Sequence, residues 1–284
     1  MAGQSVRDIK TRVGSIKNIQ DITKTMMLVA AAKLSKAESA ITRLRPYARR
    51  LNEMIADIKL RAEISHPLLS ERKVKKEFVL VVASERGLCG GFNSKIIRKA
   101  EDYFAKENTE RRLVLIGKKA SSYFGKADKD YPIVKEYHIP DKVSFDFAKI
   151  IGEELIKDYI DERFDRFVVV YNEFKSVFRQ EQVTEQLLPI IPKPSTSKFA
   201  ADYIYEPSAM NILDSLLPAH FNYQIYRILL ESAAAEHAAR MTAMEQATTN
   251  AKERIKELIL TFNRARQASI TSEIAEIVTT TMAL

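Results

Sequence analysis

A glycine-rich stretch in the first half of the chain is the first candidate for chemistry. Gly87-Leu88-Cys89-Gly90-Gly91 directly follows the apolar run 78–82. A glycine loop between a strand and a helix binds nucleotide phosphates when it reads G-x-G-x-x-G, or when a Lys-Ser/Thr pair closes it. This stretch has neither spacing, and Gly117-Lys118-Lys119 does not supply the missing pair. We interpret the glycines as a tight turn and do not expect a nucleotide there.

The single cysteine, Cys89, is the other candidate for chemistry. A thiol becomes a nucleophile when a neighbouring base or cation lowers its pKa. The four histidines lie in other segments, at His66, His138, His220 and His237, and their spacing matches no metal site. We therefore predict a buried structural thiol and no intramolecular disulfide. No catalytic residue, metal ligand or cofactor is predicted.

The elements around these residues alternate between strand and helix. Continuous apolar runs at 78–82, 113–116 and 167–171 are typical of strands buried on both faces, and 133–134 is a possible short strand. Helices are predicted at 94–106 and 144–160, with Ser144 as a cap, and edge strands at 183–190 and 203–205. This alternation predicts a doubly wound, Rossmann-like α/β domain over residues 70–206.

Both ends of the chain instead carry the pattern of a coiled coil. Apolar residues recur every three or four positions in residues 1–62, a spacing of about 3.5 that is typical of a coiled-coil seam. The first seam is Val6, Ile9, Val13, Ile16, Gln20, Thr23, Met27, Ala30, Leu34, Ala37, Ile41, Leu44, Ala48, Leu51, Ile55, Ile58 and Ala62. The second seam is Leu230, Ala234, His237, Met241, Met244, Thr248, Ala251, Ile255, Leu258, Phe262 and Ala265.

The two seams predict an antiparallel pair of helices, residues 1–62 and 207–284. Pro46 and Pro218 lie within them and are expected to bend them. We expect paired residue numbers to sum to about 266, a register that places Thr23 opposite Thr242 and Ala243. The second seam loses its phase after Ala265, so we expect the end of that helix to lack a partner helix. The predicted fold class is α/β with an antiparallel coiled coil.

The charge is concentrated on the first helix. Residues 1–62 contain 13 Lys and Arg against 5 Asp and Glu, which accounts for the whole formal charge of +8. Such a helix is compatible with a solvated face, an acidic partner or nucleic acid, although its charges are dispersed and few aromatics accompany them. No apolar run is long enough to span a bilayer, and we see no secretory leader, so we expect the protein to stay where it is made.

Six stretches of this sequence resemble one family, the γ subunits of F-type ATP synthases, and most closely those of bacteria. They occur in the family's order over nearly the whole chain. They are IKNIQDITKTMMLVAAAKL (16–34), RPYA (45–48), SERGLCGGFN (84–93), YIYEP (203–207), LLESAAAEHAARMTAMEQATTNA (229–251) and FNRARQASITSEIAEIV (262–278).

The resemblance implies a rotor without a catalytic site or cofactor of its own. Its implied partners are a ring of three α and three β subunits, the ε subunit and the membrane-embedded c-ring, with one copy per complex and no nucleic acid. The coiled coil would stand inside the ring, and rotation would couple ion flow to ATP synthesis or hydrolysis on β. The implied location is the cytoplasmic face of the bacterial membrane, reached through the c-ring.

The resemblance also implies roles for particular residues. Contacts with β are implied for Met26, Arg240, Arg266, Gln267, Thr271 and Glu273. Contacts with ε and the c-ring are implied for Tyr205 and Glu206. The chain departs from the family's usual pattern at Thr25, where Ala is usual, and at Thr280-Thr281, where Gly-Ala is usual. Two β-branched residues suit a helix slightly less well, so we expect the last turn to fray.

Two other interpretations remain open from the residues alone. One is a nucleic-acid-binding protein with a coiled-coil arm, which the basic first helix would also suit. The other is a nucleotide-using α/β enzyme. Co-purification with α and β subunits in high salt favours the rotor, whereas recovery mainly on polyanions favours the nucleic-acid-binding protein. Nucleotide binding by residues 70–205 alone would favour the enzyme.

Overall fold

The computed structural model describes residues 6–61, 66–105, 109–126, 131–192, 206 and 208–282. Its elements, in chain order, are α1 (Val6–Arg61), β1 (Lys76–Val82), α2 (Phe92–Phe104), β2 (Glu110–Ile116), α3 (Lys118–Phe124), β3 (Ile133–Tyr137), α4 (Phe145–Ile160), β4 (Arg166–Ser176), β5 (Arg179–Leu188) and α5 (Ala209–Met282). The contacts divide the chain into two compact units, one of residues 31–239 and one of residues 1–30 with 240–284.

The larger unit is built on a five-stranded sheet with the order β3-β2-β1-β4-β5. The strands are parallel except for β5, which pairs antiparallel with β4 through a hairpin. Apolar side chains cover both faces of β1, as its continuous apolar run predicts. The doubly wound α/β fold is therefore confirmed, with one antiparallel edge strand added.

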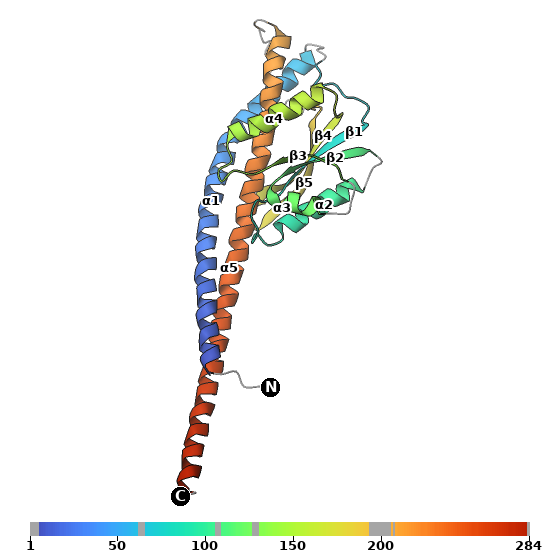
Figure 1. Ribbon diagram of the computed structural model, residues 1–284. Helices are drawn as coiled ribbons and strands as arrows, with labels where there is room; N and C mark the ends of the chain where they lie inside the picture. Colours follow the sequence, from blue (N-terminus) through green and yellow to red (C-terminus); the bar gives the residue numbers. More distant parts are fainter. Residues whose placement is uncertain are drawn as a thin grey trace. The chain divides into compact units, whose positions relative to one another are not determined.

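Helices cover both faces of this sheet (Figure 1). On one face, α1, α4 and α5 pack onto a core whose central strand residues include Leu80 and Val169. On the other face, α2 and α3 pack around Val81 and Leu115. The side chains of β1 alternate between these two cores, so the strand is buried whichever way a side chain points.

Most predicted elements are present, with some differences at their ends. The predicted short strand 133–134 is β3, and Ser144 caps α4 by accepting a hydrogen bond from the Phe147 amide at 3.3 Å. The helix α3 was missed, because seven residues give too little periodicity to distinguish a helix from a loop. The strand β5 begins at Arg179 instead of 183. The predicted strand 203–205 lies outside the described residues.

The smaller unit is the coiled coil formed by the start of α1 and the second half of α5, which run side by side (Figure 1). Ile9 and Ala30 of the first seam are buried, as are Met244 and Leu258 of the second, which confirms the seams here. No helix in the described residues has a stretch long and apolar enough to cross a membrane.

The predicted register of this coiled coil is wrong by five residues. The Thr23 and Thr248 hydroxyl oxygens lie 2.8 Å apart, so paired numbers sum to 271 rather than 266. Thr23 thus faces a polar partner, as predicted, but one further along α5 than Thr242 and Ala243. The predicted end of the pairing is confirmed. Ala265 is the last residue of α5 with a half-buried side chain, and every described residue after it is exposed.

Candidate functional site

The place where a fold of this kind would bind a ligand lies between β1 and β4. The chain leaves β1 toward β2 and β3 on one side and returns to β4 on the other, so the strand order reverses there. In open α/β sheets, ligands bind outside the carboxyl ends of the strands at such a reversal. The glycine stretch 87–91 follows β1 at this point, which makes it the natural place to look for a nucleotide site.

Protein side chains fill this position. Cys89 and Phe92 are buried against Ala235 of α5, and Phe174 of β4 and Ala239 pack onto the same cluster. Small residues on α5 let the helix approach the loop closely. The prediction that Cys89 is a buried thiol is confirmed. The loop is thus fastened to α5 through Cys89, while Gly90 and Gly91 lie exposed at its surface.

Several polar groups of the loop form hydrogen bonds within the loop itself. The Ser84 backbone amide and hydroxyl both donate to Oδ1 of the Asn93 side chain, at 3.0 and 2.9 Å, and Nδ2 of that side chain donates to the Cys89 sulfur at 3.2 Å. Gly90 takes a positive φ of 56°, and so does the non-glycine residue Leu88, at 62°. This geometry supports the interpretation of the glycines as a tight turn.

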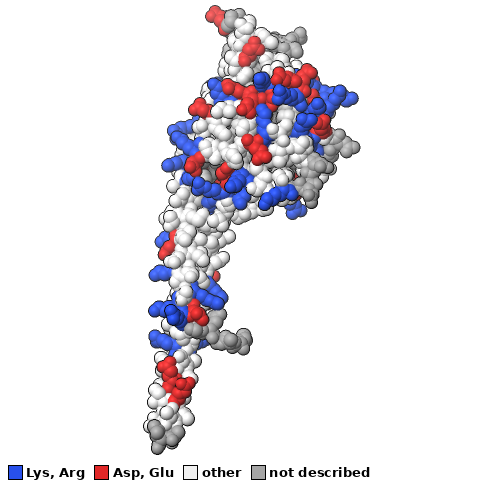
Figure 2. Space-filling view, viewed as in Figure 1, with Lys and Arg blue, Asp and Glu red and all other residues white. Residues whose placement is uncertain are grey.

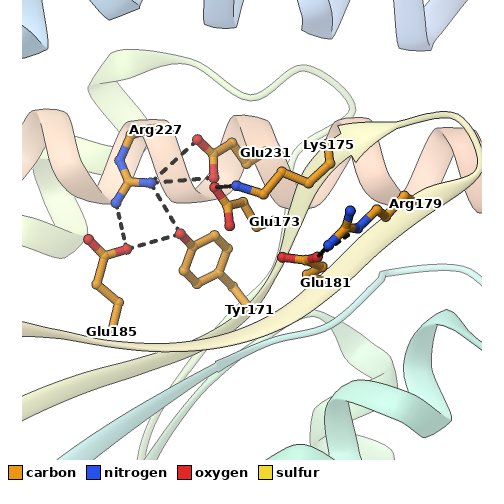
Figure 3. A network of polar contacts seen from close by, with 8 residues as sticks. All are labelled: Tyr171, Glu173, Lys175, Arg179, Glu181, Glu185, Arg227 and Glu231. Atoms are coloured by element: carbon orange, nitrogen blue, oxygen red, sulfur yellow. Dashed lines mark hydrogen bonds and ion pairs between the residues drawn. The ribbon is translucent and has the colours of Figure 1, made fainter.

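A buried polar network joins the β4–β5 hairpin to α5 (Figure 3). Arg227 of α5 donates to Glu185 at 2.7 Å, to the Tyr171 hydroxyl at 3.1 Å and to Glu231 at 3.3 Å. Burial raises the pKa of the Glu231 carboxyl, while the charge of Arg227 opposes that rise. The groups around the Arg227 guanidinium all belong to this chain. The network therefore stabilises the packing of α5 against the β4–β5 hairpin. Sequence reasoning missed it, since its members are far apart in the chain.

The coiled-coil unit carries the candidate partner surface. Figure 2 shows Lys and Arg side chains gathered around the start of α1 and acidic ones near the end of α5. Five basic side chains near the start of α1 are exposed, namely Arg7, Lys10, Arg12, Lys17 and Lys24. In the part of α1 that belongs to this unit, four large apolar side chains are also exposed, namely Ile19, Ile22, Leu28 and Val29. The sequence could have indicated these four, because none of them belongs to the first seam.

The residues expected to contact β lie in two groups on this unit. Met26 and Arg240 are half-buried on the paired part of the helices. Arg266, Gln267, Thr271 and Glu273 are all exposed, on the part of α5 beyond Ala265. In this second group the Thr271 hydroxyl donates to the Gln267 carbonyl at 2.9 Å, and Glu273 accepts from Ser269 at 3.1 Å. Both bonds follow the helix and leave the side chains at its surface.

A family model described as ATP synthase matches residues 5–284. The curated relatives include the ATP synthase gamma chain of Chlorobium phaeobacteroides, 44% identical over 96% of this chain and 97% of the relative. The gamma chain of Geotalea uraniireducens is 42% identical over 96% of each chain. The chain belongs to the ATP synthase γ-chain family.

Solved structures agree with the family at the level of the fold. A chain of the Euglena gracilis mitochondrial ATP synthase, in an assembly of OSCP, F1 and c-ring, superposes with a TM-score of 0.70 at 20% identity and covers 98% of this chain and 94% of its own. A chain of the Tetrahymena thermophila central stalk and c-ring gives 0.62 at 24% identity, covering 80% and 99%. These comparisons favour the γ-chain interpretation over the nucleic-acid-binding alternative.

The two residues expected to contact ε and the c-ring can be placed only in part. Glu206 is exposed just before α5. Tyr205 lies outside the described residues. Both remain predictions, as do the contacts expected with β and the three-part division of the chain at 1–62, 70–206 and 207–284.

Proposed function

We propose that this chain is the central shaft of a rotary ATP synthase. Its coiled coil turns inside a ring of α and β subunits, and its α/β domain transmits torque from the c-ring. Ion flow through the membrane sector is thereby coupled to ATP synthesis or hydrolysis on β. The proposal builds on membership of the γ-chain family and on solved relatives that belong to F1 and c-ring assemblies.

One observation carries the proposal, the single helix beyond Ala265. Residues 266–282 of α5 are helical and exposed, although Ile270, Ile274, Ile277 and Val278 are large and apolar. A cluster of exposed apolar side chains on one segment marks an interaction surface. This segment therefore fits a helix enclosed by other subunits.

In this arrangement the chain transmits torque and has no catalytic site of its own. We assign catalysis to the partner subunits of an ion-translocating, ATP-hydrolysing complex, because the glycine stretch after β1 lacks the spacing of a phosphate-binding loop. The contacts with β are assigned to Met26 and Arg240 on the paired helices and to Arg266, Gln267, Thr271 and Glu273 on the single helix. The contacts with ε and the c-ring are assigned to Tyr205 and Glu206.

The same proposal fixes the location and the copy number. A shaft on the axis of a ring is present once per complex. It is peripheral to the membrane and is held there through the c-ring, at the cytoplasmic face in a bacterium.

Cross-linking in the assembled complex tests the shaft. In a Cys89→Ser background, Gln267→Cys places one thiol on the single helix, and a short bifunctional reagent joins it to a neighbouring subunit. We expect a cross-link to β that abolishes ATP hydrolysis, with recovery when a cleavable linker is reduced. The Cys89→Ser parent is the control. Full hydrolysis with the cross-link intact would contradict a rotating shaft.

A further inference from the structure

A cavity of about 690 Å³ lies within the larger unit, between α1, β5 and α5. Its size falls in the range of small-molecule sites, which is roughly 300–1,000 Å³. Apolar side chains from all three elements line it, among them Ile41 and Leu44 of α1, Leu187 of β5 and Phe221 of α5. The function proposed above makes no use of this space.

Two polar side chains on the wall of the cavity each have a buried polar atom that no described residue pairs, namely the Thr184 hydroxyl and Nδ1 of His220. His220 is 7% exposed and lines the cavity, and no described residue forms a hydrogen bond with its Nδ1. A buried donor or acceptor left unpaired costs about 1–3 kcal/mol, so such groups usually have a function or a ligand.

The neighbouring side chains determine where the proton of His220 lies. Arg227 donates from Nε to the Gln224 carbonyl oxygen at 2.8 Å, which fixes the orientation of that amide. The Gln224 amide nitrogen therefore donates to Nε2 of His220, which lies 3.2 Å away. Because Nε2 accepts, the neutral ring carries its proton on Nδ1. The unpaired group is thus a donor, and it requires an acceptor.

The charges at the cavity favour an anionic acceptor. Glu185 on the wall is bound by Arg227 and by the Tyr171 hydroxyl, and Glu173 is bound by Lys175. Arg45 of α1 also lines the cavity, is exposed, and forms no ion pair with any described residue. The acidic groups are thus neutralised within the protein, while one basic group at the wall remains available.

We propose that this cavity binds an organic carboxylate with an apolar body, of the kind represented by a medium-chain fatty acid. The Nδ1–H of His220 donates to the carboxylate, and Arg45 attracts the anion. The hydrocarbon chain packs against Ile41, Leu44, Leu187 and Phe221. The site is separate from the coiled-coil surface, so the proposal does not depend on the rotor function.

Calorimetric titration of the purified full-length chain with decanoate tests this site. We expect saturable binding of one decanoate per chain. The affinity should fall at least tenfold in His220→Leu and at least threefold in Arg45→Gln, and decanol should bind at least tenfold more weakly than decanoate. Arg43→Gln is the matched control, because Arg43 is exposed on the same helix and does not line the cavity. Its affinity should equal that of the unmodified chain.

A second measurement keeps the test decisive if His220→Leu folds poorly. Long-range proton–nitrogen NMR spectra report the tautomer of each histidine. We expect the Nδ1–H form for His220 and a shift of its Nδ1 signal that saturates with decanoate. Three results would overturn the proposal: no saturable binding, equal affinity for decanol, or binding that leaves the His220 signals unchanged.

Discussion

The hydroxyl groups of Thr23 and Thr248 meet across the coiled coil at 2.8 Å, and they fix its register. Each hydroxyl also has a carbonyl acceptor in its own helix, Gln20 at 3.0 Å for Thr23 and Met244 at 2.7 Å for Thr248, so either hydroxyl can donate across the pair. A polar pair in a mainly apolar seam favours this pairing over shifted ones, because a shift would place each hydroxyl opposite apolar side chains. Thr23 is 8% exposed, so the penalty for a shift is substantial.

Cysteine cross-links measure this register directly. In a Cys89→Ser background, we expect Thr23→Cys with Thr248→Cys to oxidise readily to a disulfide, because the two side chains already touch. Thr23→Cys with Ala243→Cys is the matched control. It corresponds to the register expected from the sequence and is displaced by five residues, about 7.5 Å along the helix. Preferential oxidation of the control pair, on a non-reducing gel, would contradict the observed register.

The sequence predicted the seams correctly and their register incorrectly, for a physical reason. Which side chains face a partner is a local property of each helix, set by the spacing of its apolar residues. Register depends on how two separate helices pack, and residues 232–243 include many alanines that offer similar surfaces at several offsets. The spacing of apolar residues therefore could not distinguish a sum of 266 from the observed 271.

The buried polar sites could not have been predicted from the sequence at all. Arg227 and Glu185 lie 42 residues apart, and nothing local distinguishes them from surface charges. Nothing in the sequence around His220 shows that its ring is buried with one nitrogen unpaired, because its neighbours come from other elements of the fold. By contrast, the end of pairing at Ala265 was predictable, because the second seam itself changes phase there.

Gly152 is required by its contact with α5. A Cβ atom added at this position of α4 would lie 1.9 Å from Oδ1 of Asn222, a buried residue of α5. We expect Gly152→Ala to lower the free energy of unfolding by about 2–3 kcal/mol, because overpacking outweighs the ~1 kcal/mol gain in helix propensity. Denaturant unfolding monitored by circular dichroism gives the value.

Gly14→Ala is the matched control for this substitution. Gly14 also lies inside a helix, and a Cβ there would meet nothing within 4 Å. It should leave stability unchanged or raise it by up to about 1 kcal/mol. Combining Gly152→Ala with Asn222→Ala should restore much of the loss, since the clash then disappears. Additive effects of the two substitutions would show that the contact is not the cause.

Arg227 should be the most sensitive member of the network in Figure 3. Arg227→Met leaves Glu185 and Glu231 without their cation, in a site where the Glu231 side chain is 10% exposed. We expect a loss of about 2–4 kcal/mol in the free energy of unfolding, reduced from the full buried-pair cost because Glu185 is partly solvated. Arg179→Met is the control. Its pair with Glu181 is exposed, and its removal should cost less than about 0.5 kcal/mol.

The basic face of α1 should matter for coupling. Charge reversal to Glu at Arg7, Lys10, Arg12, Lys17 and Lys24 would replace five exposed positive charges near the start of the helix with negative ones. We expect weaker coupling of ATP hydrolysis to ion pumping in reconstituted vesicles, because the surface facing an acidic partner would become repulsive. A charge-preserving variant with Lys and Arg exchanged at the same positions is the control. Equal coupling in both variants would refute the proposed role of this charge.

His220 should make the stability of the larger unit depend on pH. Burial lowers the pKa of this ring from 6.5 to about 4, and the neighbouring charge of Arg227 acts in the same direction while Glu185 opposes it. The folded state therefore favours the neutral ring. The stabilisation that this preference adds to the unfolding free energy is complete above the unfolded pKa of 6.5. It is lost as the pH falls toward 4. Between pH 7.5 and 5 this amounts to about 2 kcal/mol of unfolding free energy.

Replacing the ring by Leu in His220→Leu removes this titration. Between pH 7.5 and 5, the unfolding free energy of the variant should fall by about 2 kcal/mol less than that of the unmodified chain. Identical slopes of unfolding free energy against pH in the two proteins would show that another group causes the pH dependence.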